Sequence, residues 1–357
     1  METFRIAVID GDGIGPEVTH EAIRVVEEAA ALSDARFEWT NYPWGTDLYL
    51  TEGCMAPDDY LDRLAEHDAI FLGAIGHPLV HDHITLNGLL LPIRRRFDQY
   101  VCLRPAYLYA GIESPLRDKQ PGSIDMLVFR ENTEGEYANV GGRLYPQTNQ
   151  DIAVQSSVFT RRGCERIIRA AFERARSRPQ KRVASITKSN AQGFSMVLWD
   201  DVFEFVAAEF PDIETETLLI DRAVMEFVRR PESFDVVVAS NLFGDILTDL
   251  AAIVVGSMGL AASANIDPTR TKPSMFEPVH GSAPDIAGQG IANPLAAILS
   301  AAMMLEHLGL NQPAEAIHRA VKDLLADESP KTPDLGGTGT TEEVGAAVSD
   351  IIRRSIS

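Results

Sequence analysis

Short apolar runs alternate with amphipathic segments along nearly the whole chain, and this order constrains the fold more than any other feature. Apolar runs bounded by turn residues are typical of buried strands. They occupy residues 5–9, 69–72, 126–129, 182–186, 216–220 and 236–239. Helical periodicity fills the segments between them, as in residues 16–32, which begin with a proline. Alternation of this kind predicts an α/β protein built on a mainly parallel sheet.

The net charge narrows the possible partners. The 357 residues, enough for one large domain or two, include 52 acidic and 32 basic side chains and carry a net charge of -20. Such a surface repels nucleic-acid phosphates and anionic membranes, so we expect no nucleic acid and no membrane as partner. The three cysteines have no metal-binding spacing, and the chain enters a strand without a signal peptide, which favours the cytoplasm.

Two aspartates, Asp245 and Asp249, follow the predicted strand 236–239. The segment 245–255 has a helical pattern, so both carboxylates lie on one helical face, one turn apart. Like charges at this spacing repel by roughly 0.2–0.5 kcal/mol on a solvated helix. A divalent cation between them would turn that repulsion into binding. The alternative is a solvated helix N-terminus, which favours acidic residues without binding a metal.

Three arginines could form a clamp for carboxylates. Arg94 lies in Ile-Arg-Arg-Arg-Phe, Arg104 in Leu-Arg-Pro, and Arg130 at the end of the predicted strand 126–129. A guanidinium is planar and binds carboxylates in a bidentate manner, and each charged hydrogen bond contributes about 1.5–3 kcal/mol. Together they could hold a dicarboxylate despite the acidic surface. Taken singly, each arginine is better explained as a surface charge.

Three more side chains are candidates for chemistry. Tyr137 follows Arg130 by seven residues, and Lys188 follows the strand 182–186, so either could exchange protons with a substrate. Burial beside other cations would lower the pKa of the lysine; a solvated lysine is the alternative. Asp221 ends the strand 216–220 and begins a helix, which is consistent with a helix cap or with a ligand-binding acid.

Two turns could face a nucleotide. Residues 10–15, Asp-Gly-Asp-Gly-Ile-Gly, follow the first strand, but the glycine spacing departs from the dinucleotide fingerprint and the acids would repel a pyrophosphate. A tight turn lining a cleft is the better interpretation. The segment 276–285 is dense in turn residues whose N–H groups could cradle phosphate. There, Asp285 could accept hydrogen bonds from ribose and would repel a 2′-phosphate.

Several of these segments together resemble the β-decarboxylating dehydrogenases, a family that includes isocitrate, 3-isopropylmalate, homoisocitrate and tartrate/D-malate dehydrogenases. The resemblance spans essentially the whole chain, and it rests on residues 10–17, 103–105, 130–135, 187–188, 241–249 and 277–288. It implies a two-domain, isopropylmalate dehydrogenase-like fold with a mixed central sheet and a non-Rossmann nucleotide site. Residues 1–103 and 258–357 would form the large nucleotide-binding domain. Residues 104–257 would form the substrate and dimerisation domain, with a protruding arm near 133–155.

The resemblance also implies roles for individual residues. It makes Tyr137 the catalytic acid and Lys188 the base, and it places Mg²⁺ or Mn²⁺ on Asp221, Asp245 and Asp249. Substrate contacts are expected from Arg94, Arg104, Arg130, Asn87 and Leu90. NAD contacts are expected from Ile14, Glu277, His280, Gly281, Ser282, Ala283, Asp285 and Asn293. Asp285 matches the NAD-using members, whereas NADP users carry lysine there. Lys188 and Asp221 are expected to reach the active site of the partner subunit in a homodimer.

The residues before Arg94 bear on the substrate. Gly88 and Leu90 stand where isocitrate enzymes have serine and asparagine, which disfavours isocitrate. Asn87 replaces the tryptophan of tartrate/D-malate relatives and the glutamate of isopropylmalate enzymes. The sequence therefore predicts NAD- and metal-dependent oxidation, with decarboxylation, of a D-malate- or tartrate-type 2-hydroxy dicarboxylate. The alternatives are a 3-isopropylmalate dehydrogenase and a catalytically silent regulatory subunit, and a requirement for K⁺ is left open.

Overall fold

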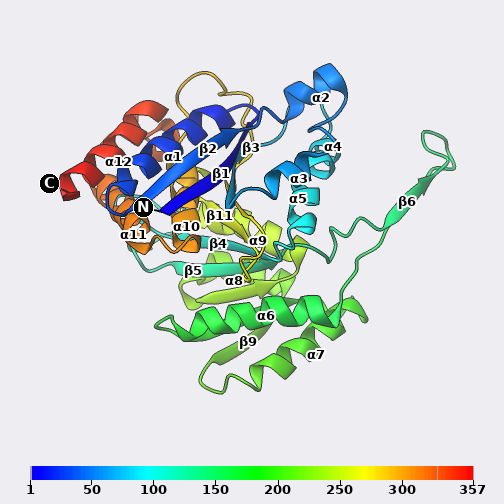
Figure 1. Cartoon of the computed structure of the whole chain (residues 1–357). Coiled ribbons are helices and arrows are strands. Elements are labelled where there is room, and N and C mark those ends of the chain that lie inside the picture. Colours follow the sequence, from blue (N-terminus) through cyan, green and yellow to red (C-terminus); the bar gives the residue numbers. More distant parts are fainter. Residues whose placement is uncertain (1, 328, 357) are drawn as a thin grey trace.

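A single mixed sheet forms the centre of the molecule, as seen in a computed structural model that describes residues 2–327 and 329–356 (Figure 1). Its strand order is β2-β1-β3-β12-β11-β4-β5-β10-β8-β9. The strands are β1 (Glu2–Gly11), β2 (Ala35–Asn41), β3 (Ala69–Ala74), β4 (Val101–Tyr107), β5 (Asp125–Glu131), β8 (Arg182–Thr187), β9 (Glu214–Leu219), β10 (Val236–Ala239), β11 (Ala262–Ile266) and β12 (Ser274–Pro278).

The direction of the strands reverses in the middle of this sheet. Strand β4 pairs antiparallel with β5 and with β11, and β11 pairs antiparallel with β12. All other pairs are parallel. The mixed central sheet implied by the family resemblance is therefore confirmed, and the two outer groups of parallel strands run in opposite directions.

Helices cover both halves of the sheet. They are α1 (Gly15–Ala30), α2 (Thr46–Glu52), α3 (Tyr60–Leu64), α4 (Asp82–Thr85), α5 (Leu91–Arg96), α6 (Arg161–Arg176), α7 (Ser195–Ala207), α8 (Ile220–Arg229), α9 (Asn241–Val254), α10 (Leu295–His307), α11 (Asn311–Ala326) and α12 (Thr341–Ile356). Short turns are the π-helical η1 (Leu86–Leu90) and the 3₁₀ turns η2 (Pro231–Ser233), η3 (Met258–Leu260) and η4 (Pro333–Leu335). Helix α10 is buried from Leu295 to Leu305, which explains why its sequence is apolar all round.

The buried side chains form separate clusters on the two halves of the sheet. One cluster joins β5, β8 and β10 to α6, α7, α8 and α9. The second joins β1 and β12 to α1, α10, α11 and α12, and a smaller third one surrounds Trp44 and Ile93. The proposed boundaries of the two domains remain a prediction. No helix within residues 2–327 and 329–356 has the length and apolarity needed to cross a membrane.

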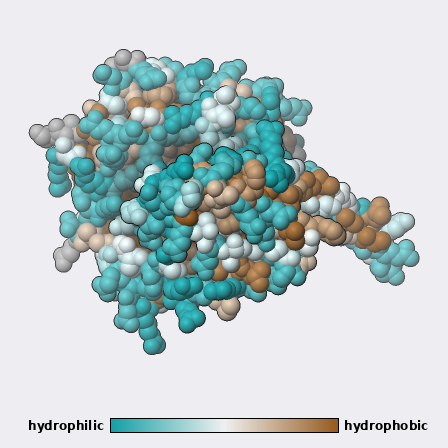
Figure 2. Space-filling model, turned by 90° about the horizontal axis from the view of Figure 1, so that it is seen from below, coloured by the Kyte–Doolittle hydropathy of each residue, from teal (hydrophilic) through white to brown (hydrophobic). Residues whose placement is uncertain are grey.

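A two-stranded hairpin projects from the body of the molecule (Figure 1). It consists of β6 (Gly141–Leu144) and β7 (Ile152–Gln155), which pair antiparallel. Apolar side chains gather on this projection, as Figure 2 shows. They are the exposed Val140, Leu144, Tyr145, Ile152 and Val154. An apolar surface of this kind on an extended arm is typical of a segment that packs against another chain.

Candidate active site

A cavity of about 200 Å³ brings the three predicted arginines together. Residues from both halves of the sheet line it: Gly73, Ala74, Ile75, Leu86, Leu90, Leu91, Arg94, Arg104, Arg130, Tyr137, Asp245, Glu277, Pro278, Val279, His280 and Gly281. The arginines come from α5, β4 and β5, and all three are buried. A pocket with three buried guanidiniums is suited to a ligand that carries more than one negative charge.

Asp245 lies at the centre of the polar contacts in this cavity. Its carboxylate forms an ion pair with Arg130 Nη1, approaches Arg104 Nη1 at 3.4 Å, and accepts a hydrogen bond from the Tyr137 hydroxyl at 2.8 Å. Burial acts to raise the pKa of Asp245, but the charges of Arg130 and Arg104 outweigh it and hold the pKa below its usual value. The carboxylate is therefore ionised at neutral pH.

The predicted partner of Asp245 lies one turn further along α9. The pKa of Asp249 is raised, first by burial and then by the negative charge of Asp245. The two carboxylates thus repel each other, and a divalent cation between them would relieve that repulsion. Carboxylate oxygens are the ligands that Mg²⁺ prefers. The residues present therefore fit the implied metal, although two carboxylates make an incomplete site.

Lys188 and Asp221 lie away from this cavity and contact each other. Lys188 Nζ donates to Asp221 Oδ1 at 2.7 Å, and the Asp221 side chain is 62% exposed. Within the described ranges, no three His, Cys, Asp or Glu side chains form a group that could hold a metal. One chain therefore assembles only part of the predicted site. That the two residues serve the partner subunit stays a prediction.

Arg94 is paired with a residue expected to contact NAD. Its Nη2 donates to Glu277 Oε1 at 2.7 Å, and the same oxygen accepts from Asn265 Nδ2 at 2.8 Å. The Nε of Arg94 is buried and lacks a hydrogen-bond partner in the described chain. Because an unsatisfied buried donor is costly, Arg94 Nε is available to a ligand, whereas Glu277 is already engaged.

The glycine-rich turn of residues 10–15 packs against the predicted nucleotide loop. The N–H of Ile14 donates to Ser282 O at 2.9 Å. A Cβ on Gly13, which has φ +60, would lie 2.0 Å from the same oxygen, so only glycine fits. Asp12 accepts hydrogen bonds from Thr46 and from the N–H of Gly76. Asp12, one of the two acids that disfavour a phosphate-binding turn, therefore links neighbouring loops through hydrogen bonds.

Two further residues of the predicted NAD site differ in their free hydrogen-bonding capacity. Burial lowers the pKa of His280, and its Nδ1 pairs with Gly281 O at 3.0 Å. The buried Nε2 has no partner in the described chain, so the neutral ring can accept from a ligand. The amide of Asn293 is occupied, because it donates to Asp334 and accepts from the N–H of Leu295. Asp285 and Ala283 lie in the same loop, with Asp285 exposed.

The structure does not bring Asn87 to the cavity, contrary to the sequence-based expectation. Asn87 is exposed, and its Nδ2 donates to His83 O at 2.8 Å. The wall is formed instead by Leu86, Leu90 and Leu91, together with Ile75. The π-helical turn, closed by Leu91 N–H to Leu86 O, sets which residues face inward. Leu86 was missed, although its spacing of four from Leu90 is a helical signal.

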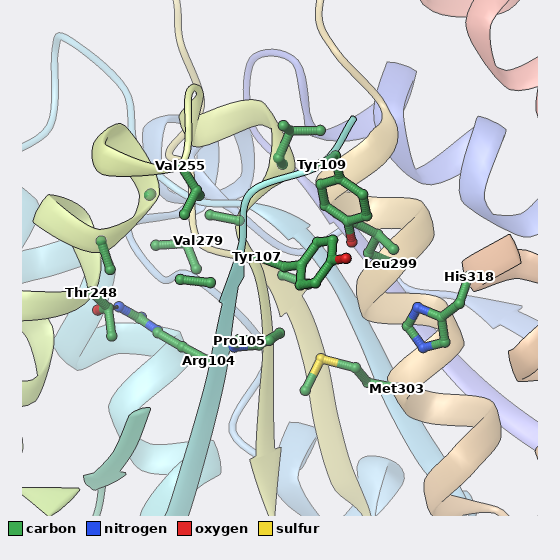
Figure 3. Close-up of a pocket in the computed structure, with 16 residues that line it drawn as sticks. Arg104, Pro105, Tyr107, Tyr109, Thr248, Val255, Val279, Leu299, Met303 and His318 are labelled. Carbon is green, nitrogen blue, oxygen red and sulfur yellow. Dashed lines mark hydrogen bonds between the residues drawn. The ribbon is translucent and has the colours of Figure 1, made fainter. Parts of the chain in front are cut away.

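A second cavity, of about 80 Å³, lies behind Arg104 (Figure 3). Tyr107, Tyr109 and Met303 line it, while Arg104 extends toward Thr248 and donates to its Oγ1 at 2.6 Å. This cavity shares Arg104 and Val279 with the first one but contains neither Tyr137 nor a carboxylate. Its lining is mainly apolar, so the first cavity is the candidate active site.

Replacement of Gly244 by alanine is expected to destabilise the protein. A Cβ at this position would lie 2.6 Å from Cβ of Arg130, where α9 packs against β5. Overpacking of this kind costs about 1–3 kcal/mol of unfolding free energy. Urea denaturation measures the loss. Gly193→Ala is the control because nothing lies within 4 Å of its added methyl group, and equal stabilities of the two variants would contradict the close approach.

Comparison with known proteins gives the family. The family model "Isocitrate/isopropylmalate dehydrogenase" matches residues 5–348. The chain belongs to this family. It is 51% identical to D-malate dehydrogenase [decarboxylating] of Escherichia coli (strain K12), over 99% of this chain and 100% of that protein. It is 50% identical to tartrate dehydrogenase/decarboxylase of Pseudomonas putida, over 99% and 98% of the two chains.

Solved structures agree on the fold. The crystal structure of isocitrate dehydrogenase from Methylococcus capsulatus superposes with a TM-score of 0.87 at 35% identity, covering 99% of this chain and 100% of that chain. The TT0538 protein from Thermus thermophilus gives a TM-score of 0.85 at 32% identity, covering 98% and 68%. The isopropylmalate dehydrogenase-like fold expected from the sequence is confirmed.

Proposed function

We propose that this protein is a cytoplasmic enzyme that oxidises the CH–OH group of a D-malate- or tartrate-type 2-hydroxy dicarboxylate with NAD and Mg²⁺ or Mn²⁺, and decarboxylates the product. The observation that carries the proposal is the cavity where Arg94, Arg104 and Arg130 converge beside Tyr137 and Asp245. The three guanidinium groups suit a substrate that carries two carboxylates. The relatives named for D-malate and tartrate support the substrate class.

The side chains divide the chemistry between them. The arginines would bind the carboxylates, and Lys188 of the partner subunit would take the proton of the 2-hydroxyl group. NAD, held by the loop of residues 277–285, would supply the hydride acceptor. Asp245 and Asp249, with Asp221 of the partner subunit, would hold the divalent cation, which would supply Lewis-acid polarisation of the substrate oxygens. After CO₂ leaves, Tyr137 donates a proton to the carbon that held it. Burial, followed by the charge of Asp245, raises the pKa of Tyr137 to about 12, so it carries that proton at neutral pH.

We further propose a homodimer that completes each site. Helices α8 and α9 pack together and expose apolar side chains, as the arm does. On the helices these are Met225, Val228, Ile246 and Ile253. A self-complementary two-fold interface across this surface would cover them, because both subunits contribute the same patch. Lys188 and Asp221 would then enter the partner's cavity.

The leucine wall supports 3-isopropylmalate as a second candidate substrate. Leu86, Leu90 and Leu91 would face the substituent on C3. An apolar group there is favoured, whereas the 3-hydroxyl of tartrate would lack a partner at a cost of about 1–3 kcal/mol. We therefore place D-malate ahead of tartrate.

The test is an NADH-absorbance assay with Mn²⁺ and K⁺ present, over D-malate, tartrate and 3-isopropylmalate. The highest kcat/KM on D-malate would support the proposal, and the highest on 3-isopropylmalate would replace it with the second candidate. Mn²⁺ binding without NADH formation on any of these acids would indicate a catalytically silent subunit instead.

Cofactor preference should depend on Asp285. This exposed carboxylate would bind the ribose hydroxyls of NAD and repel the 2′-phosphate of NADP. Asp285→Lys is expected to lower kcat/KM with NAD and raise it with NADP, changing their ratio by about tenfold or more. Asp285→Asn, which removes the repulsion without adding a cation, should give an intermediate ratio. An unchanged ratio in both variants would show that Asp285 does not face the ribose.

A further inference from the structure

We propose that Asn241 is a positioning residue that aims the Arg130 guanidinium into the substrate cavity. The inference rests on the proposed function, in which Arg130 binds a substrate carboxylate. Asn241 is the first residue of α9 and is 1% exposed, as is Arg130 on β5. Nothing in the sequence distinguished this asparagine from the rest of the segment that carries Asp245 and Asp249.

One oxygen of Asn241 holds one edge of the guanidinium. Asn241 Oδ1 accepts from Arg130 Nε at 3.0 Å and from Nη2 at 2.7 Å. Nη1 lies on the other side, where it pairs with Asp245. The remaining N–H groups therefore face the cavity in a fixed orientation, which a long side chain with many rotamers would not keep unaided.

The asparagine is itself held on both sides. Its Nδ2 donates to Glu134 O at 3.1 Å, which fixes the amide so that the oxygen faces Arg130. The carboxylate of Glu136 accepts from the hydroxyl of Ser240 at 2.8 Å and from the N–H of Leu242 at 3.1 Å, the two residues flanking Asn241. The start of α9 is thus bound to the loop that leads to Tyr137.

Helix capping does not explain this side chain. An asparagine at a helix N-terminus ordinarily accepts from a backbone N–H of the first turn. The oxygen of Asn241 accepts from Arg130 instead, and the side chain of the N-cap residue Ser240 makes no capping hydrogen bond to the backbone of α9. A neutral acceptor has a further consequence, because it orients Arg130 without adding a second negative charge to a guanidinium that already pairs with Asp245. An aspartate here would add one.

A double-mutant cycle on ligand binding tests this role. Titration calorimetry with Mn²⁺ and D-malate, without dinucleotide, would compare the wild type, Asn241→Leu, Arg130→Gln and the double variant. Loss of one charged hydrogen bond corresponds to about a ten- to hundredfold rise in Kd. We expect this rise in Asn241→Leu, while the Kd for NAD changes by less than about threefold. If Asn241 acts through Arg130, the double variant binds D-malate no more weakly than Arg130→Gln alone.

Controls separate positioning from folding and from the proposed function. Ser185→Ala removes a buried hydrogen bond to Trp199 in the same half of the sheet, and it should lower stability without changing the Kd for D-malate. Asn241→Ser replaces Asn241→Leu if the latter does not fold. Additive losses in the cycle, or an unchanged Kd in Asn241→Leu, overturn the inference. Sulfate is titrated in parallel. If the protein binds sulfate but not D-malate, the proposed substrate is refuted. The double-mutant cycle measured with sulfate would then still decide the role of Asn241.

Discussion

Two inactive variants are expected to restore activity to each other when their subunits are mixed. Lys188→Met removes the proposed base, and Asp245→Asn removes a proposed metal ligand; each homodimer should lose about 10²–10⁴ in kcat. In the single chain Lys188 pairs with Asp221, away from the cavity that contains Asp245. In a mixed dimer, one site would carry both substitutions and the other neither. Purified mixed dimers should therefore have about one half of the wild-type activity, because one of their two sites is intact.

NADH formation is measured for each homodimer and for the mixed dimer. The mixed dimer is obtained by coexpressing the two variants with different tags and purifying on both tags. Lys188→Met mixed with Asp221→Asn is the matched control, because both substitutions lie on the surface that enters the partner's site. That mixture should stay inactive. Binding of NAD by Lys188→Met should survive, since the proposed contacts to NAD come from the loop of residues 277–285 and not from the lysine. Mixed dimers of the first pair that form but remain inactive would refute the shared site.

Local sequence patterns predicted much of the fold. The apolar run 236–239 is found as β10 with the same bounds, because four consecutive valine and alanine residues are buried on both faces. Four strands of the central sheet, β2, β4, β11 and β12, were missed. Strand β4 contains Arg104 and Pro105, and the buried arginine hides the alternation on which a strand prediction depends. Strand β11 is made of small and polar residues whose burial comes from its neighbours in the sheet.

Contacts between distant segments account for what the sequence did not reveal at the site. The helix predicted to begin at Asp245 begins at Asn241, because Glu136 binds the N–H of Leu242 from a loop 106 residues earlier. The pair of Arg94 and Glu277 spans 183 residues. Such pairings depend on the tertiary structure, so a motif can identify reactive residues without indicating what orients them.

The local sequence pattern also did not predict which side chains of the turn at residues 86–90 face the cavity. Asn87 was expected in the pocket wall from its position before Arg94, but the π-helical turn places Leu86 there. A turn with an extra residue rotates every side chain that precedes it relative to an α-helix. No composition signal in this leucine-rich segment marks that insertion.

Tyr137→Phe is expected to separate decarboxylation from the protonation that follows it. The hydroxyl of Tyr137 donates to Asp245 in the cavity, and it is the proposed proton donor after CO₂ leaves. Without it, protonation of the product should slow by about 10²–10⁴, while binding of NAD and hydride transfer persist. A single-turnover experiment on D-malate would record NADH by absorbance and quantify the 2-oxo acids after quenching. We expect CO₂ to be released and the enol product to be protonated slowly by solvent.

The pH dependence gives an independent check on the same residue. Burial raises the pKa of Tyr137 to about 12, so the hydroxyl stays protonated below that pH and loses its proton only as the pH rises through it. Any loss of wild-type activity between pH 8 and 10 should therefore belong to another group, and the Tyr137→Phe variant should keep that part of the profile. Tyr109→Phe is the matched control, because this tyrosine is buried in the cavity behind Arg104, apart from the substrate cavity. Equal losses in both variants would mean that the hydroxyl of Tyr137 supports packing, whereas a loss confined to Tyr137→Phe is the result expected of a proton donor.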